Sequence, residues 1–410
     1  MAARELLTAM KAGEGAASAG ESASVFVVAG EASGDWAGAR LAEELRRRRP
    51  ELRLRGIGGR QMTAAGVELF ADSSDWGAIG VFEAASKVAR VWRVLGATRA
   101  HLRVERPSAL VLIDCGSFNM PLAESAQKMG IPTLYYLPPG SWSRKPRSLR
   151  VREVVDAIAT PFPWSRDLLA GGKARVEWVG HPVVEAARPK IGAEEAARRY
   201  GVNRGRAVVA LAPGSRSQEM RYLFPVLAEA AARLGREFDG LQFLAPVAPT
   251  VNPEEVREGL EGAGVKAVLL AGMDYDALQL AQAAAVCSGT ATLEFACLGV
   301  PMVVAYRASR LTTLQYRLIR GLIGGQRFAA MPNIIAGREI VRELMGSAAS
   351  PAAIAARVGR LLVDDPERAR VTRELELVAA ALGPPGASER TAELVLGLIE
   401  GGEEPGEARG

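Results

Sequence analysis

Two loops in the second half of the sequence combine small residues with polar groups in a way suited to binding an anion. The segment APGSRSQEM (212–220) follows an apolar run and precedes a helical pattern. Gly214 permits close approach of the backbone, and the amides of Ser215 and Arg216 can face an anion at the positive end of a helix. The Arg216 guanidinium can add a charge-assisted hydrogen bond to a diphosphate. An ordinary turn with a solvated arginine would have the same sequence.

The segment CSGTATLE (287–294) repeats this design. Ser288, Gly289 and Thr290 are expected to form a small-residue turn whose amides and hydroxyls surround a phosphate. Glu294 lies one helical turn after Thr290, where its carboxylate can accept hydrogen bonds from two ribose hydroxyls. The alternative is a capping box that begins at Thr290, but its third helical position holds leucine rather than Glu or Gln. Together the two loops favour a nucleotide site.

A third polar segment, MPNIIAGREIV (331–341), lies among apolar residues. Asn333, Gly337 and Arg338 are expected to reach the same cleft. The alternative is a helix start followed by a surface arginine.

In the first half, GEASGDWAGA (30–39) follows an apolar run but lacks the GxGxxG spacing of a dinucleotide site. Glu31, Ser33 and Asp35 are polar groups at the predicted end of a strand, where they are candidates for contact with a substrate. The alternative for Asp35 is a helix N-cap. GIGGRQM (56–62) is predicted to be a second glycine-rich turn.

These loops need elements that bring them to one edge. Short apolar runs alternate with amphipathic stretches along most of the chain, which indicates parallel sheets covered by helices on both faces. Ligands of such sheets bind beyond the carboxyl ends of the strands, where the polar loops lie. The predicted strands are VFVVAG (25–30), SALVLID (108–114), IPTLYYL (131–137), AIAT (157–160), VEWVG (176–180), AVVALAPG (207–214), QFLAP (242–246), AVLL (267–270), AAVCSG (284–289) and PMVVAY (301–306).

The polar stretch 188–205 interrupts this alternation, so we predict a linker near 185–205 between two similar α/β halves. A length of 410 residues also favours two domains. The predicted division is a disordered leader (1–23), an N-terminal Rossmann-like domain (24–187), a C-terminal Rossmann-like domain (188–385), a helix that packs back onto the first domain (386–400) and a disordered tail (401–410).

Composition narrows the functional classes. The net charge of +5 suits an anionic partner, and no segment indicates a nucleic-acid-binding module. The three cysteines have neither CxxC nor Cys/His spacing, so a disulfide framework and a zinc site are not expected. No apolar stretch is long enough for a transmembrane helix. Segments 86–106 and 306–328 mix apolar residues with arginine, a pattern shared by membrane-surface helices and by packed helices with solvated arginines.

The ordered motifs of the chain resemble those of the lipid-A-disaccharide synthase family, from about residue 25 to 400. The motifs are VAGEASGD, GIGGRQM, GAIGVFE, IDCGSFN, VGHP, APGSRSQE, SGTATLE, PMVVAYR and PNIIAGRE. The resemblance implies a GT-B fold, in which two Rossmann-like doubly wound domains face each other across a cleft. It also implies transfer of diacylglucosamine from its UDP derivative to diacylglucosamine 1-phosphate, with inversion and release of UDP.

The resemblance implies further that neither metal nor cofactor is needed, that the enzyme works at the cytoplasmic face of the inner membrane, and that it is a homodimer. Asn333 and Arg338 match the family's PNxxAGRE motif and are expected to serve catalysis. The residues expected to hold UDP are Gly214, Ser215, Arg216, Ser288, Gly289, Thr290, Ala291 and Glu294. Those expected to contact the acylated sugar-phosphate acceptor are Glu31, Ser33, Asp35, Ser117, Asn119 and Trp142.

The predicted acceptor side departs from the family pattern I-D-x-P-D-F-N. Here the segment is IDCGSFN (113–119), so Ser117 stands at the position of the second acidic residue, the family's catalytic base. A serine hydroxyl is too weak a base for this role, and Asp114 becomes the candidate, with Glu31, Asp35 and Glu83 as alternatives. The loop around Trp142 also matches the family only approximately.

Three other functions stay open at this point. The chain could be a glycosyltransferase with another acceptor. A UDP-sugar 2-epimerase shares the architecture but would need a catalytic histidine in the cleft. Ser117 leaves open a nucleotide-sugar-binding protein without transferase activity. His181, in the VGHP turn, is expected to fix the hinge or touch nucleotide rather than act as a base. Asp274 and Asp276 resemble a DxD metal motif, but helix capping explains them better.

Overall fold

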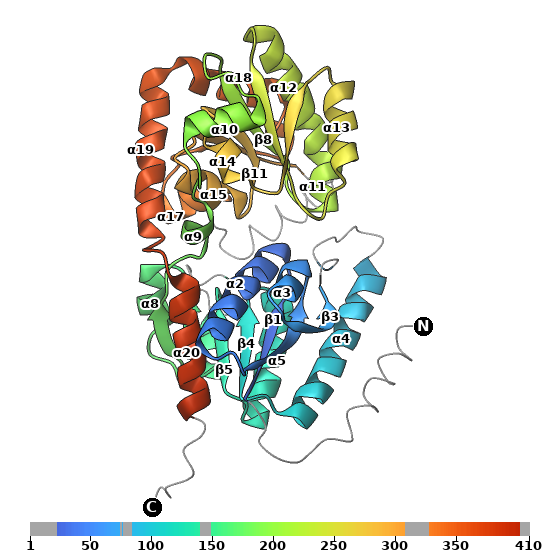
Figure 1. Cartoon of the computed structure of the whole chain (residues 1–410), viewed down its shortest axis with the longest axis vertical. Coiled ribbons are helices and arrows are strands. Elements are labelled where there is room, and N and C mark those ends of the chain that lie inside the picture. The colour runs from blue at the N-terminus through green and yellow to red at the C-terminus, as the bar shows by residue number, and fades with distance from the viewer. Residues whose placement is uncertain (1–22, 74–75, 77–83, 140–148, 308–327, 402–410) are drawn as a thin grey trace, which may run out of the picture.

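The computed structural model describes residues 23–73, 76, 84–139, 149–307 and 328–401. They form two parallel sheets, each flanked by helices (Figure 1). The first sheet has seven strands in the order β3-β2-β1-β4-β5-β6-β7, and the second has six in the order β10-β9-β8-β11-β12-β13. This strand order is that of the Rossmann fold, so the predicted fold class is confirmed.

The first half runs from strand to helix with short connections. Its elements are β1 (Ser24–Ala29), α2 (Ala32–Arg48), β2 (Arg53–Gly58), α3 (Arg60–Ala64), β3 (Glu68–Asp72), α4 (Ala84–Glu105), β4 (Ala109–Ile113), α5 (Gly116–Met129), β5 (Thr133–Tyr136), α7 (Val151–Val154), β6 (Ala157–Thr160), α8 (Pro163–Leu169), β7 (Arg175–Trp178) and α9 (Val183–Ala186).

The second half continues the alternation. Its elements are α10 (Ala193–Tyr200), β8 (Val208–Ala212), α11 (Ser217–Tyr222), α12 (Phe224–Glu237), β9 (Gln242–Val247), α13 (Pro253–Gly262), β10 (Ala267–Ala271), α14 (Tyr275–Leu278), β11 (Ala283–Cys287), α15 (Ala291–Cys297), β12 (Met302–Tyr306), α17 (Met331–Ala336), β13 (Arg342–Met345), the 3-10 turn η1 (Gly346–Ala348), α18 (Pro351–Val363), α19 (Asp365–Ala381) and α20 (Ala387–Gly401).

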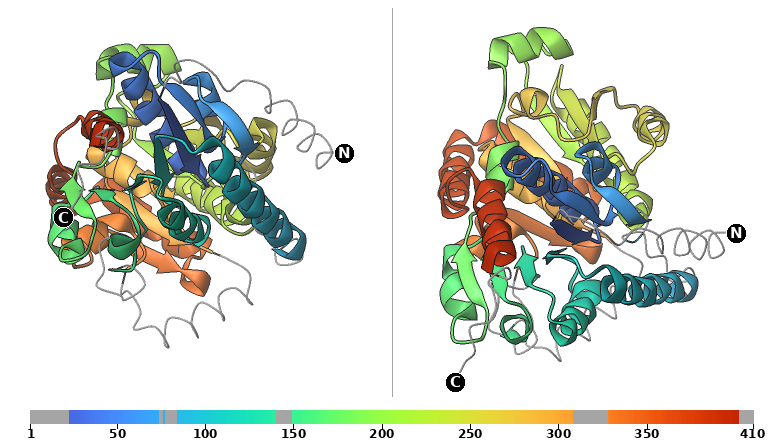
Figure 2. Two further views of the ribbon diagram at one scale, coloured as in Figure 1. Left: turned by 90° about the horizontal axis from the view of Figure 1, so that it is seen from below. Right: turned by 60° about the horizontal axis from the view of Figure 1, so that its bottom comes forward.

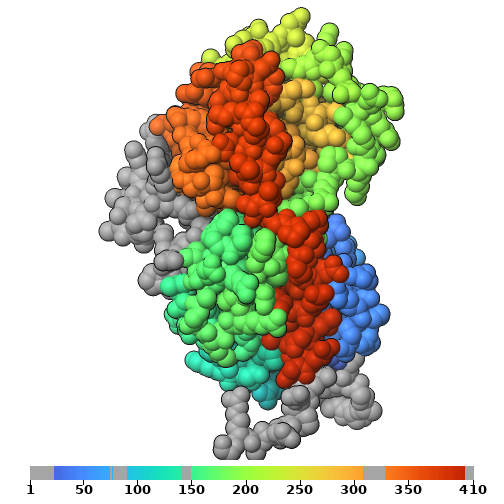
Figure 3. All heavy atoms as spheres, turned by 90° about the vertical axis from the view of Figure 1, so that its left-hand side faces the viewer, coloured from blue at the N-terminus to red at the C-terminus, as the bar shows by residue number. Residues whose placement is uncertain are grey.

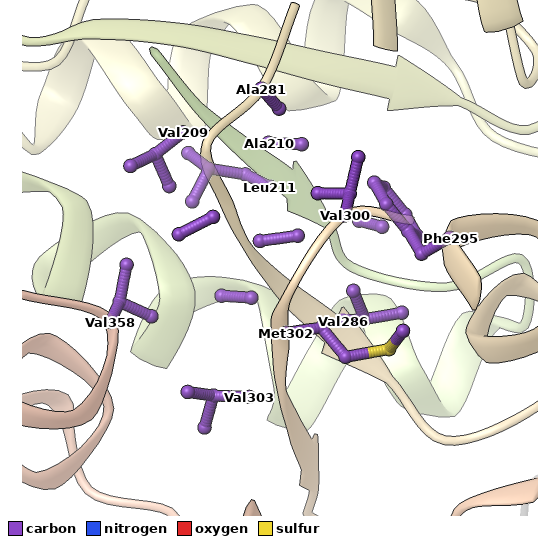
Figure 4. Packing of buried hydrophobic residues seen from close by; sticks show 14 of the residues in the cluster. Val209, Ala210, Leu211, Ala281, Val286, Phe295, Val300, Met302, Val303 and Val358 are labelled. Atoms are coloured by element: carbon purple, nitrogen blue, oxygen red, sulfur yellow. The ribbon is translucent and has the colours of Figure 1, made fainter. Parts of the chain in front are cut away.

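Each sheet is buried on both faces, because successive side chains of a strand point in opposite directions. In β1, Val25 and Val27 belong to one core cluster and Phe26 and Val28 to the other. The core of the second half is a single large cluster around β8, β11 and β12, part of which Figure 4 shows. Near-continuous apolar strands in the sequence reflect this burial on two sides.

The chain crosses between the halves a second time near its end. After α19, which packs on α15 and α17, the helix α20 lies beside α2 of the first half (Figures 2 and 3). Ala392, Val395 and Ile399 of α20 share a buried cluster with Leu41 and Leu45 of α2. The sequence limits predicted for the domains remain a prediction, and the described strands of the two sheets fall on either side of 185–205.

Several predicted elements need correction. The segment 56–62 is not a simple turn, because Gly56–Gly58 end β2 and Arg60–Ala64 form α3. A side chain at Gly56 would overlap the Val27 carbonyl oxygen at 1.9 Å, so glycine lets β2 approach β1. The strands β2, β3 and β13 were not predicted, and the predicted linker contains the helix α10.

Trp142, segment 77–83 and most of 306–328 lie outside the described residues, as do the predicted leader apart from Ala23 and the predicted tail apart from Gly401. In the part of the chain that is described, no helix is both long and apolar enough to cross a membrane.

Candidate active site between the two sheets

The predicted loops meet where the strand order of each sheet reverses. In the first sheet this reversal lies between β1 and β4, whose carboxyl ends lead to Glu31 and Asp114. In the second it lies between β8 and β11, which lead to Arg216 and Ser288. Such a reversal opens a crevice at the edge of a sheet, the usual ligand site of doubly wound folds.

The two crevices face each other, because one ion pair joins them. Arg216 Nη2 donates to Glu31 Oε2 at 2.5 Å across the halves. Both side chains are partly exposed, 45% for Arg216 and 37% for Glu31, so this pair is open to a competing ligand. Predicted nucleotide and acceptor residues therefore come together at one place.

The amides predicted to face an anion already bind a carboxylate of the protein itself. Glu219 Oε2 accepts hydrogen bonds from the amides of Ser215 (2.8 Å) and Arg216 (3.1 Å). Gly214 makes this approach feasible, since its φ is +113° and a side chain there would lie 2.2 Å from Glu219 Oε2. The buried Glu219 thus caps the start of α11, and contact of these amides with a ligand remains a prediction.

The second predicted loop is built from backbone and hydroxyl contacts. Ser288 Oγ donates to the Ala329 carbonyl at 3.0 Å, while Gly289 and Thr290 are exposed beyond β11. Thr290 has helical backbone angles and makes no side-chain cap, so the capping-box alternative is wrong. Ala291 is the first residue of α15. This turn therefore offers an exposed backbone edge beside the Arg216 loop.

Glu294 lies one turn into α15, where Tyr275 Oη donates to its Oε1 at 2.6 Å. Burial raises the pKa of Glu294, and the hydrogen bond from Tyr275 opposes that rise. A carboxylate with one oxygen held by a tyrosine keeps its other oxygen for a hydroxyl donor.

Asp114 occupies a strained turn at the end of β4. Asp114 and Cys115 have φ of +48° and +41°, a left-handed conformation that disfavours residues with a Cβ. Two side chains fix the turn through the Asp114 carbonyl, which accepts from Asn119 Nδ2 (2.8 Å) and Tyr135 Oη (2.7 Å). Strain of this kind is often retained at functional sites.

The carboxyl group of Asp114 is poorly solvated. Burial is the main cause that raises its pKa to about 6, the Glu31 carboxylate adds to the rise, and Arg216 opposes it. At pH 7 the Asp114 carboxyl is therefore mostly ionised, and its carboxylate is a stronger base than that of an ordinary aspartate.

The other predicted acceptor residues divide into two groups. Ser117 is exposed in the first turn of α5 and Ser33 is half-buried in the first turn of α2. Asn119 is fully buried, and its amide donates to the Ile113 and Asp114 carbonyls. The Asn119 amide nitrogen therefore supports the turn, and contact of Asn119 with the acceptor remains a prediction.

Asp35 also supports the loop. It is buried and accepts hydrogen bonds from the amides of Gly59 (2.6 Å), Gln61 (3.1 Å) and Met62 (3.1 Å). These three amides surround the carboxylate, and contact of Asp35 with the acceptor remains a prediction. The N-cap alternative fails, because α2 begins after Glu31 and Asp35 instead holds the start of α3.

Asn333 and Arg338 of the PNxxAGRE motif both form contacts within the fold. Asn333 is fully buried; its Oδ1 accepts from the Ile340 and Val341 amides, and its Nδ2 donates to the Val341 carbonyl and to Glu343 Oε1. The hydrogen-bonding groups of Asn333 are thus engaged within the fold, and its catalytic role remains a prediction.

Arg338 is paired elsewhere. Its Nη2 lies 2.5 Å from Glu374 Oε2, so Arg338 binds the helix α19 rather than Glu31 or Asp114. The catalytic role of Arg338 remains a prediction.

Two alternatives are settled by local contacts. Asp274 Oδ1 accepts from the Ala277 amide as the N-cap of α14, which confirms helix capping for this segment. His181 Nδ1 accepts from the Val183 amide, and burial lowers the pKa of His181 to about 4. At neutral pH His181 is uncharged and engaged in the hinge.

Three residues of the site were missed by reasoning on the sequence. Glu219 and Tyr275 contact predicted site residues, and Glu343 Oε1 and Oε2 accept from the amides of Ala329 and Ala330 beneath Ser288. Glu219 had a sequence signal, because a glutamate three residues after Arg216 suits a capping box. Tyr275 and Glu343 lie 19 and 14 residues from their partners and had none.

One described cavity lies away from these residues. It has a volume of about 490 Å³ and is lined by Gln282, Pro301, Arg368 and Arg373, among others. Gln282 and Pro301 directly precede β11 and β12, so this cavity opens at the amino ends of those strands. The site is at the opposite, carboxyl edge.

Known proteins share this organisation. The sequence model of the family described as lipid-A-disaccharide synthetase matches residues 25–392. The lipid-A-disaccharide synthase of Syntrophus aciditrophicus is 38% identical over 92% of this chain and 98% of its own. The enzyme of the same name from Geobacter sulfurreducens is 38% identical over 92% of this chain and 97% of its own.

Solved structures agree on the fold. A putative UDP-N-acetylglucosamine 2-epimerase from Listeria monocytogenes has a TM-score of 0.64 at 12% identity, over 95% of this chain and all of that one. A calicheamicin glycosyltransferase has a TM-score of 0.58 at 15% identity, over 94% of this chain and all of that one. Identities this low show the two-domain fold alone, whereas the full-length sequence match is specific. The chain belongs to the lipid-A-disaccharide synthase family of glycosyltransferases.

Proposed function

We propose that this protein transfers 2,3-diacylglucosamine from its UDP derivative to 2,3-diacylglucosamine 1-phosphate and releases UDP, at the cytoplasmic face of the inner membrane. The observation that carries the proposal is the ion pair of Arg216 with Glu31 at the facing edges of two Rossmann-like sheets, where the charges of both residues also act on Asp114. The full-length sequence match to lipid-A-disaccharide synthases supports the choice of substrates.

On the donor side, the departing diphosphate needs positive charge and aligned donors. Arg216 supplies the charge, and the exposed turn of Gly289 and Thr290 supplies backbone amides. Glu294 accepts from the ribose hydroxyls with the oxygen that Tyr275 leaves free. The negative charge of the departing UDP is then stabilised by amides, an arginine and helix ends, so that no metal cation is needed.

On the acceptor side, Asp114 removes the proton from the attacking hydroxyl. Its raised pKa brings it closer to the working pH, which favours proton transfer by a general base. The hydroxyl attacks the anomeric carbon as the bond to the diphosphate breaks, so configuration inverts. Ser117, exposed one residue into α5, then contacts the acceptor rather than acting as the base.

An acylated acceptor has to be reached from a lipid surface. Trp92 and Val104 of α4 are exposed by 60% and 77%. These residues support contact of α4 with the membrane, as in interfacial helices. A homodimer is proposed from the family resemblance alone.

The proposal is tested by measuring UDP release from UDP-2,3-diacylglucosamine with and without 2,3-diacylglucosamine 1-phosphate. We expect release only when the acceptor is present. UDP-sugar binding without turnover would favour a non-catalytic homologue. In that case Ser117→Asp is the informative variant, because restored transfer at unchanged UDP affinity would show that the native chain is catalytically weakened.

A further inference from the structure

The pairing of Glu31 with Arg216 has a consequence for how the donor binds. Arg216 is the residue proposed above to hold the diphosphate, yet its Nη2 is 2.5 Å from Glu31 Oε2 and its Nη1 is 3.4 Å from Glu219 Oε1. Carboxylate oxygens thus occupy both terminal nitrogens of the guanidinium. A phosphate that used the same donors would take the place of a carboxylate.

Of the two carboxylates, Glu31 is the one that can leave. Glu219 is 5% exposed and also accepts from two backbone amides, so it is part of the loop. Glu31 comes from the other half of the chain, and Arg216 is the described partner of its side chain. An exposed ion pair is weak, and exchanging it for a more highly charged diphosphate is favourable.

The loop backbone itself is fixed. Thr250 Oγ1 donates to the Ser215 carbonyl at 2.7 Å, and Glu219 holds the amides of Ser215 and Arg216. The exchange is therefore made by the arginine side chain and not by the loop. When the side chain turns, the contact between the two halves at this point is released.

We propose that Glu31 is a positioning residue whose carboxylate holds Arg216 across the interdomain gap and gives it up to the diphosphate of the donor. Donor binding thereby competes with a contact between the two halves. This inference rests on the proposed function, because it takes the diphosphate of a UDP-sugar as the competing anion.

The test compares UDP with uridine, which lacks the diphosphate, on wild type and Glu31→Gln by titration calorimetry and ligand-observed NMR. Loss of the competing carboxylate is expected to tighten UDP binding about two- to fivefold, the range spanned by exposed ion pairs, and to leave uridine unchanged. Glu44→Gln is the matched control, because Glu44 pairs with Arg47 at the far end of the same helix.

A second variant guards against misfolding. Glu31→Asp keeps the charge but shortens the side chain, so it should tighten UDP binding by less than Glu31→Gln. Unchanged or weaker UDP affinity in both variants, or equal shifts for UDP and uridine, would overturn the exchange while the proposed function stood. Failure of the wild-type chain to bind UDP would overturn both.

Discussion

At the scale of single residues, polar side chains differ in how many of their hydrogen-bonding groups are already engaged within the fold. The amide nitrogens of Asn119 and Asn333 donate hydrogen bonds within the fold, whereas Asp114 lies at a strained turn and has a raised pKa. Motif membership alone did not separate these cases. Position in the PNxxAGRE motif predicted a catalytic Asn333, and only the fold shows that strand β13 and its preceding turn surround it.

The base is the sharpest prediction at this scale. Asp114→Asn should lower kcat about 10²–10⁴-fold, because general-base catalysis contributes that much. In the wild type, kcat/KM should fall as pH drops through about 6, where Asp114 becomes protonated. Rate measurements across pH check both. Asp167→Asn, at an exposed position of α8, is the control. An unchanged acid limb in the Asp114 variant would contradict the assignment.

The raised pKa that favours catalysis by Asp114 lowers the stability of the folded protein at neutral pH. The pKa of Asp114 is raised from 3.8 to about 6 on folding, so between these values the folded state binds the proton more tightly. The contribution of Asp114 to the free energy of unfolding therefore falls as pH rises from about 4 to 6, and it stays reduced above pH 6. Asp114→Asn should gain up to about 3 kcal/mol in free energy of unfolding at pH 7. Urea unfolding at pH 4 and 7 tests this, and an equal effect at both values would count against it.

At the scale of elements, much of the sheet architecture was predictable. Strands buried on two sides have near-continuous apolar sequences, and the predicted run 157–160 matches β6 (Ala157–Thr160) residue for residue. The strand β2 was missed because Arg53, Arg55 and three glycines near its end resemble a turn. The location of the Arg216 loop followed from its sequence, but its partner Glu31 lies 185 residues away and had no local signal.

The Arg216 loop depends on glycine at 214. Gly214→Ala should weaken UDP binding at least about tenfold and lower the free energy of unfolding by about 1–3 kcal/mol, because the new Cβ would displace Glu219. Calorimetry with UDP and thermal unfolding measure the two effects. Gly272→Ala is the control, since Gly272 also has positive φ but no atom within 4 Å of the new Cβ. Equal UDP affinities in the two variants would show that Glu219 does not shape the site.

At the scale of the whole molecule, the two halves are tied at the double crossing as well as at Glu31. Arg390 of α20 donates to the Val179, Pro384 and Pro385 carbonyls, and thus joins the first crossing of the chain to the second. Glu185 Oε1 accepts from the Gly386 amide in the same region. These contacts lie away from the Arg216 loop and fix the arrangement that brings the two crevices together.

Removing the hydrogen bonds of Arg390 should destabilise both halves of the molecule. Arg390→Met keeps the apolar stem but loses the donors, so we expect a loss of about 1.5–3 kcal/mol, as for hydrogen bonds to charged groups. Differential scanning calorimetry is expected to show a lower or split transition, because the halves unfold less cooperatively. Arg257→Met removes an exposed pair with Glu254 and should have little effect. Identical transitions for both variants would show that the hydrogen bonds of Arg390 do not hold the two halves together.

The most direct measurement is titration calorimetry of UDP on the wild-type chain and Arg216→Gln. We expect that the wild type binds UDP and that the variant loses at least about 10²-fold in affinity, because a charged donor to the diphosphate is removed. Arg233→Gln, which removes an exposed pair with Glu229 on α12, should bind as the wild type does. Equal UDP affinity in Arg216→Gln and the wild type would show that Arg216 does not bind the diphosphate.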